Sequence, residues 1–86
     1  MTPERPTIAE GLDLNETDDG LIIYVPATDR VHYLNSTASV VLQLCDGTRT
    51  PAEIATEVGE VFQLEASPVA ETEDCLERFG REGLLS

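Results

Sequence analysis

Residues 21–35 read LIIYVPATDRVHYLN, and this stretch decides the fold. It holds two runs of β-branched and aromatic residues, 21–25 and 30–34, which are typical of strands. Pro26 ends the first run because proline has no N–H to donate to a ladder. The short segment up to Asp29 then joins the two runs. The stretch therefore predicts an antiparallel β-hairpin.

A shorter strand is expected just before the hairpin. Leu12 and Leu14, followed by Asn15-Glu-Thr, indicate extended chain, and Asp18-Asp19-Gly20 is typical of a turn because glycine accepts a positive φ. In the run 30–34, Val31 and Tyr33 point to one face of the strand, and His32 and Leu34 point to the other. The sequence therefore predicts a three-stranded antiparallel meander.

Three helices follow, where the apolar spacing changes from two residues to between three and four. The first begins with a cap on Asn35 or Ser36 and ends at Asp46-Gly47. The second begins with the capping box of residues 50–53, and the third begins at Ser67-Pro68. Their apolar stripes are predicted to be Ala38, Val41, Leu42 and Cys45; Ile54, Val58, Val61 and Phe62; and Val69, Thr72, Leu76 and Phe79. Strands followed by helices predict an α+β fold with the helices against one face of the sheet.

The chain has 86 residues, enough for one domain with a single thin core. Residues 1–11 contain two prolines and several polar residues, and we interpret them as a flexible N-terminal arm. Residues 12–86 form the predicted domain. The first residues lack the apolar segment of a secretion signal, and no apolar run is long enough to span a bilayer, so a cytoplasmic protein is expected.

The charge of the chain disfavours two classes of partner. Seventeen Asp and Glu oppose five Arg, for a net charge of −12. Nucleic-acid binding relies on Lys and Arg to neutralise phosphates, and anionic membranes repel acidic proteins. We therefore expect neither nucleic acid nor membrane as a partner. A small acidic carrier protein fits the size and charge, but the chain has no Asp-Ser pair for a prosthetic arm and has a strong strand signal.

The residues needed for catalysis or metal binding are scarce. His32 is the only histidine, and Cys45 and Cys75 are far apart with no CxxC pair. The chain contains no glycine-rich phosphate loop. We therefore expect a protein that is not an enzyme and that needs no cofactor or metal, with both cysteines as small apolar residues.

The strand over residues 30–34 is predicted to lie at the edge of the sheet, with no lysine or proline to guard it. The third helix is expected beside this edge, so the two would form a groove for an extended peptide. An unguarded edge also allows two copies to pair as a homodimer. Arg30, Arg78 and Arg81 fall on these two elements, where they either attract an acidic ligand or, in the helix, only complement its dipole.

Three segments together resemble a known family: VHYLNSTA at 31–38, LQLCDGTRTPAEIA at 42–55 and EGLL at 82–85. From about Gly20 to the C-terminus, the chain resembles the PqqD-like family, the recognition elements of ribosomally synthesised and post-translationally modified peptides (RiPPs). The resemblance implies a winged-helix-like domain of three strands and three helices.

The resemblance also implies a function. The domain would bind the leader of a precursor peptide as an added strand, as a non-catalytic chaperone for a maturation enzyme. That enzyme would be a radical SAM maturase, or a leader peptidase and cyclase. The peptide-binding residues implied are Arg30, Val31, His32, Tyr33 and Leu34 on the strand and Glu71, Asp74, Cys75 and Arg78 on the helix. The alternatives are a nucleic-acid-binding winged helix and a protein–protein adaptor.

Overall fold

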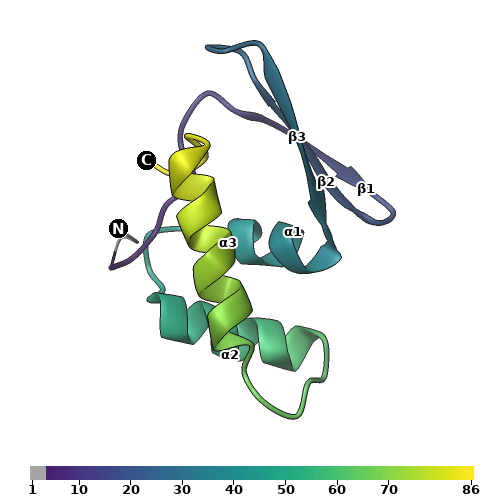
Figure 1. Ribbon diagram of the computed structural model, residues 1–86, viewed down its shortest axis with the longest axis vertical. Coiled ribbons are helices and arrows are strands. Elements are labelled where there is room, and N and C mark those ends of the chain that lie inside the picture. Colours follow the sequence, from purple (N-terminus) through teal and green to yellow (C-terminus); the bar gives the residue numbers. More distant parts are fainter. Residues whose placement is uncertain (1–3) are drawn as a thin grey trace.

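The computed structural model describes residues 4–86 and contains three strands followed by three helices (Figure 1). The strands are β1 (Asp13–Thr17), β2 (Gly20–Val25) and β3 (Arg30–Asn35), and they form one antiparallel sheet in the order β1-β2-β3. The helices are α1 (Ser36–Gln43), α2 (Pro51–Val61) and α3 (Val69–Arg81). The predicted α+β fold and the order of its elements are confirmed.

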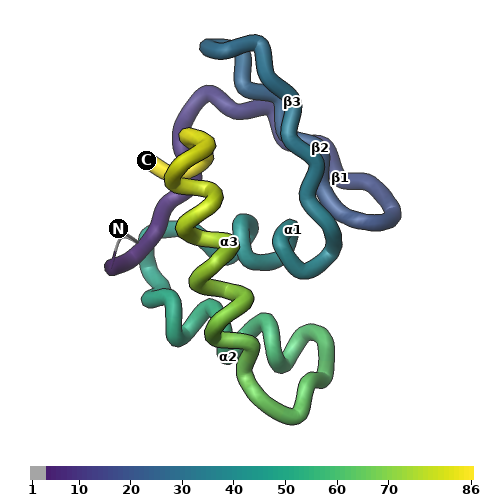
Figure 2. Tube along the Cα trace, in the orientation of Figure 1, coloured from purple at the N-terminus to yellow at the C-terminus, as the bar shows by residue number. Residues whose placement is uncertain are grey.

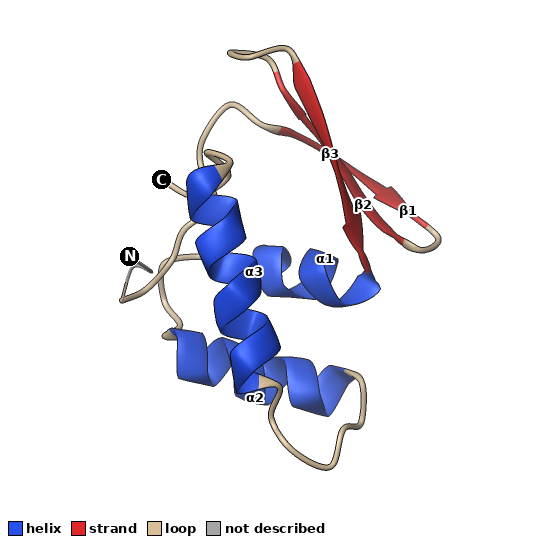
Figure 3. Ribbon diagram, in the orientation of Figure 1, coloured by secondary structure: helices blue, strands red, loops and turns tan. Residues whose placement is uncertain are grey.

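The core lies between the sheet and the helices, which gather on one side of it (Figure 3). On β2, Leu21, Ile23 and Val25 are buried and alternate with half-buried residues. On β3 only Leu34 is fully buried. Burial of such side chains contributes about 25 cal/mol for each Å² of apolar surface removed from water. The central strand is therefore held through its inward face, which fixes the register of β3 beside it.

Helix α1 begins where the sequence predicts. The side chain of Asn35 accepts a hydrogen bond of 2.9 Å from the backbone N–H of Ala38, so Asn35 is the cap. Ser36 instead donates to the carbonyl of Asp19 in the β1–β2 turn. The predicted stripe is buried in full, although Cys45 lies just beyond the last residue of the helix.

Helix α2 has the predicted capping box. Thr50 accepts from the backbone N–H of Glu53, and the Glu53 carboxylate accepts from the backbone N–H of Thr50. The latter bond holds the pKa of Glu53 below its usual value, because it favours the charged form. Within the helix, a Cβ on Gly59 would lie 3.5 Å from Pro68 and Ser67, so Gly59 packs against the loop before α3.

The prediction that Val61 and Val69 belong to the core is wrong. Val61 is 59% exposed and Val69 is 45% exposed. Val61 is the last residue of α2 and Val69 the first of α3, so both lie next to the connecting loop, whose residues 63–67 are exposed. The start of α3 also differs, because Pro68 takes the cap position and no side-chain cap bond forms.

The N-terminal arm is tied to the domain over part of its length. Residues 1–3 lie outside the described part of the chain. Pro6 is buried, and Ile8 donates to the carbonyl of Cys45. Ala9 donates to the carbonyl of Leu84, and Ser86 donates to that of Thr7. Figure 2 shows this segment running beside the end of the chain after α3. Residues 6–9 thus differ from the loose arm expected, because their backbone groups pair with two loops that the sequence pattern does not connect.

Cys45 gives a testable consequence of this packing. Burial raises the pKa of its thiol to about 12, so at pH 8 about one molecule in ten thousand carries the reactive thiolate. Burial also raises the pKa of the half-buried Cys75. We expect iodoacetamide at pH 8 to leave Cys45 unmodified in native protein and to modify it in 8 M urea. Mass spectrometry of the peptides would measure this, and rapid native labelling of Cys45 would contradict the packing.

Within residues 4–86, none of the helices has both the length and the apolar character required to cross a bilayer.

Candidate functional site

The free edge of β3 is the first element of the site. Strand β3 pairs with β2 on one side, and no other strand within residues 4–86 pairs with its second side. The carbonyl oxygen of Leu34 points toward β2, since it lies 1.9 Å from where a Cβ on Gly20 would stand. Backbone groups alternate in direction along a strand. Val31 and Tyr33 therefore direct their N–H and C=O groups outward, to the free edge.

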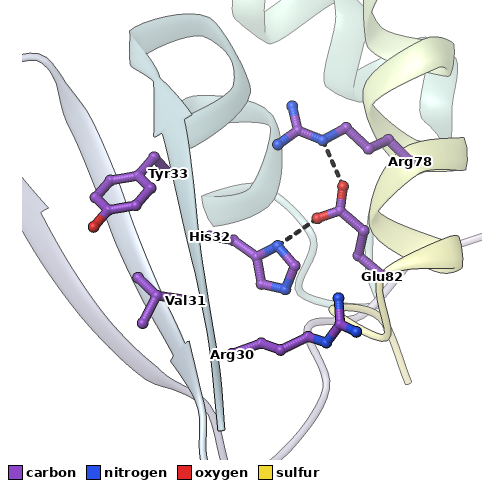
Figure 4. A pocket seen from close by; sticks show the side chains of 6 residues that line it. All are labelled: Arg30, Val31, His32, Tyr33, Arg78 and Glu82. Atoms are coloured by element: carbon purple, nitrogen blue, oxygen red, sulfur yellow. Dashed lines mark hydrogen bonds and ion pairs between the residues drawn. The ribbon is translucent and has the colours of Figure 1, made fainter. Parts of the chain in front are cut away.

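The second element is the C-terminal end of α3. A cavity of about 620 Å³ opens between it and β3. The residues that line it are Arg30, Val31, His32, Tyr33, Arg78 and Glu82 (Figure 4). We call this cavity the β3–α3 groove. It unites a strand edge with hydrogen-bonding capacity and a helix that carries charged side chains.

One carboxylate links the two walls of the groove. An oxygen of Glu82 lies 2.5 Å from Nδ1 of His32, and its other oxygen accepts from Nε of Arg78 at 2.7 Å. Both interactions are drawn in Figure 4. The contact with His32 is an ion pair, since the Glu82 oxygen that makes it, Oε2, is buried and has no hydrogen-bond partner among the described residues. The second ring nitrogen of His32 is Nε2. This Nε2 is buried and has no hydrogen-bond partner among the described residues.

The side chains of β3 divide between two surfaces. Arg30 and His32 point toward α3, whereas Val31 and Tyr33 project to the opposite side of the strand (Figure 4). That opposite side carries exposed apolar surface, since Tyr33 is 71% exposed and Val31 47% exposed. The side chain of Leu34 is buried in the core and its carbonyl points toward β2, so neither is offered to a ligand at the free edge.

Of the four helix residues predicted for the site, one lines the groove and three do not. Arg78 lines the groove, as expected. Glu71 and Asp74 are exposed on the earlier part of α3 and do not line it. Cys75 is half-buried and packs against the core. Glu82 was not predicted, because it lies one residue beyond the helix, although its spacing of four from Arg78 is the signal of an ion pair.

No group of three or more potential metal ligands occurs among residues 4–86. The groove instead offers backbone donors and acceptors on one wall and charged side chains on the other. Such a combination is suited to binding an extended peptide.

A comparison with protein families gives a match over residues 20–85, to the family described as coenzyme PQQ synthesis protein D (PqqD). The chain belongs to the PqqD family. The matched region begins at the first residue of β2 and includes both walls of the groove. The arm and β1 precede it, so the PqqD match rests on the part of the chain that forms the site.

A solved structure resembles this PqqD-family chain over almost its full length. It is TbiB1 in complex with the TbiA(beta) leader peptide, with a TM-score of 0.77 and 18% sequence identity. The alignment covers 93% of this chain and 94% of TbiB1. At this identity the likeness establishes a common fold. A search of curated proteins gives no match.

Proposed function

We propose that this protein binds the leader segment of a ribosomally made precursor peptide and presents it to a maturation enzyme. The observation that carries the proposal is the outward backbone of Val31 and Tyr33, on a free strand edge that faces the groove. An extended peptide placed there gains main-chain hydrogen bonds and extends the sheet by one strand. Membership of the PqqD family and a fold shared with a leader-bound protein support the same role.

A peptide in this position is recognised on both of its faces. Side chains of a strand alternate, so one set enters the groove toward His32, Arg78 and Glu82. The other set lies beside Val31 and Tyr33 on the outer side of the sheet. Cross-strand pairs of this kind contribute roughly 0.2–1 kcal/mol each. The two faces together give sequence specificity, whereas the shared backbone bonds give affinity.

We infer a binding role and not a catalytic one. Among residues 4–86, no serine, threonine or cysteine lines the groove, and the histidine of the groove is engaged with Glu82. Chemistry on the peptide then belongs to the partner, which we propose to be a radical SAM maturase or a leader peptidase and cyclase. Both cysteines are free thiols, which suits a reducing compartment such as the cytoplasm.

The free edge of β3 also permits self-association. A second copy of the chain can pair with this edge, and such a homodimer would compete with the peptide for the same backbone groups.

Nucleic acid is the poorest candidate ligand, because the exposed side of α2 presents the carboxylates of Glu53 and Glu60, which repel phosphates.

The direct test is isothermal titration calorimetry with the leader of the precursor gene nearest to the gene for this protein. The leader should bind with one site per chain, and a scrambled peptide of the same composition should not. Absence of binding by any leader encoded in the same gene neighbourhood would overturn the proposed function.

Tyr33→Ala tests the outer face. Its ring is largely exposed, lies opposite Ile22 of β2, and gains a second cross-strand neighbour when the peptide is bound. We expect leader affinity to fall about two- to fivefold while the thermal melting curve stays unchanged, because the ring is not in the core. Leu14→Ala is the control, since Leu14 is exposed on the far strand β1. Equal losses in the two variants would contradict strand addition at β3.

A further inference from the structure

The charge of the groove is opposite in sign to that of the protein. The whole chain carries −12, whereas the groove contains two arginines, Arg30 and Arg78, against the single carboxylate of Glu82. Few arginines are available, since there are five in the chain. An acidic side chain is therefore repelled by most of the surface and attracted to this groove.

Arg30 is the arginine of the groove that stays available. Within residues 4–86, Arg30 and Arg5 form no ion pair, and of these two only Arg30 lines the groove. Arg49, Arg78 and Arg81 each have a carboxylate partner. Its neighbour Asp29 is engaged elsewhere, accepting a hydrogen bond of 2.7 Å from the hydroxyl of Tyr24. The side chain of Arg30 points toward α3, into the groove (Figure 4). A helix dipole cannot explain this arginine, because it lies on a strand.

Arg78 is only partly available. It donates through Nε to Glu82, and the structure shows no other partner for its remaining N–H groups among the described residues. A second carboxylate brought to Arg78 would meet the negative charge of Glu82. The favourable place for an acidic side chain is therefore beside Arg30, at the start of β3.

We propose that the peptide accepted by the groove carries an acidic side chain on its helix-facing side that pairs with Arg30, and that Glu82 opposes it by occupying Arg78. This proposal rests on the proposed function and narrows its ligand to leaders with an Asp or Glu at that position. Arg30 then selects among peptides, because every extended peptide offers the same backbone groups.

A double-mutant cycle tests the pair. Each Asp and Glu of the nearest precursor's leader is replaced by Asn or Gln, and every peptide is titrated against the native protein and against Arg30→Gln. We expect one amide replacement to weaken binding to the native protein about three- to tenfold and to have little effect on Arg30→Gln. Arg81→Gln is the matched control, because it removes the same charge from an exposed side chain outside the groove.

Glu82→Gln tests the competing carboxylate. The amide keeps the size of the side chain and removes its charge, so the acidic leader should bind about two- to fivefold more tightly, and less of this gain should remain in 0.5 M NaCl. A thermal melt of each variant shows whether the fold is retained. Weaker binding by a folded Glu82→Gln would contradict the competition.

The outcomes separate this proposal from the proposed function. If leaders bind but every amide replacement has the same effect on native protein and Arg30→Gln, the acidic specificity is wrong and leader binding stands. A leader that binds tightly without any Asp or Glu has the same meaning. If no leader binds, both proposals fail.

Discussion

Replacing Val31 with proline should weaken leader binding strongly while the domain stays folded. The N–H of Val31 points to the free edge, so β2 does not use it, and proline is tolerated at such edge positions. A peptide added to β3 would lose this donor and meet the proline ring in its place. Leaving a peptide carbonyl unpaired costs about 1–3 kcal/mol. We therefore expect the affinity for the leader, measured by calorimetry, to fall about tenfold to a hundredfold.

Val31→Ala is the control for this variant, because it shortens the same side chain and keeps the N–H. It should bind within about fivefold of the native protein, in keeping with the loss of one cross-strand contact. Circular dichroism melts of both variants would establish that the fold is retained. Full affinity in a folded Val31→Pro would mean that the peptide does not use this edge.

Replacing Gly20 with alanine should destabilise the domain severely. An added Cβ would lie 1.9 Å from the carbonyl oxygen of Leu34 and 2.9 Å from the carbonyl carbon of Asn35. These are backbone atoms of the β2–β3 ladder and cannot move aside as a flexible side chain would. We expect a loss of about 3 kcal/mol or more in the free energy of unfolding, measured with urea.

Gly80→Ala makes the same substitution where the surroundings are open. Gly80 is exposed in α3, and a Cβ there would meet nothing within 4 Å. Alanine has a higher helix propensity than glycine, so this variant should gain about 0.5–1 kcal/mol. A loss of unfolding free energy in Gly20→Ala together with a gain in Gly80→Ala would support the close approach at Gly20. A mild effect of Gly20→Ala would contradict it.

Local chemistry explains why so much of the fold could be predicted from the sequence. The hairpin follows from two β-branched runs and Pro26, and the start of α2 follows from the reciprocal bonds of Thr50 and Glu53. The exposure of Val61 could not be predicted, because helical spacing identifies a face and not where the opposing element ends. The backbone hydrogen bonds of residues 6–9 join segments that are far apart in the chain, so the spacing of apolar residues does not predict them.

The candidate site could be predicted in part for a similar reason. An edge strand beside a helix follows from the order of the elements, and this places Arg30, His32 and Arg78 near one another. The choice of helix residues depends on the rotation of α3, which spacing alone leaves open. Leu76 and Phe79 turn inward and bring Arg78 to the groove, with Glu82 one turn later, while Glu71 and Asp74 lie outside it.

Amide hydrogen exchange by NMR tests strand addition at β3 most directly. In the free protein, the amides of Val31 and Tyr33 point to the open edge, whereas that of His32 points toward β2. With saturating leader, exchange at Val31 and Tyr33 should slow by at least about tenfold, and exchange at His32 should change little. Unchanged exchange at Val31 and Tyr33 in the presence of a bound leader would contradict the account, because the peptide would then lie elsewhere on the protein.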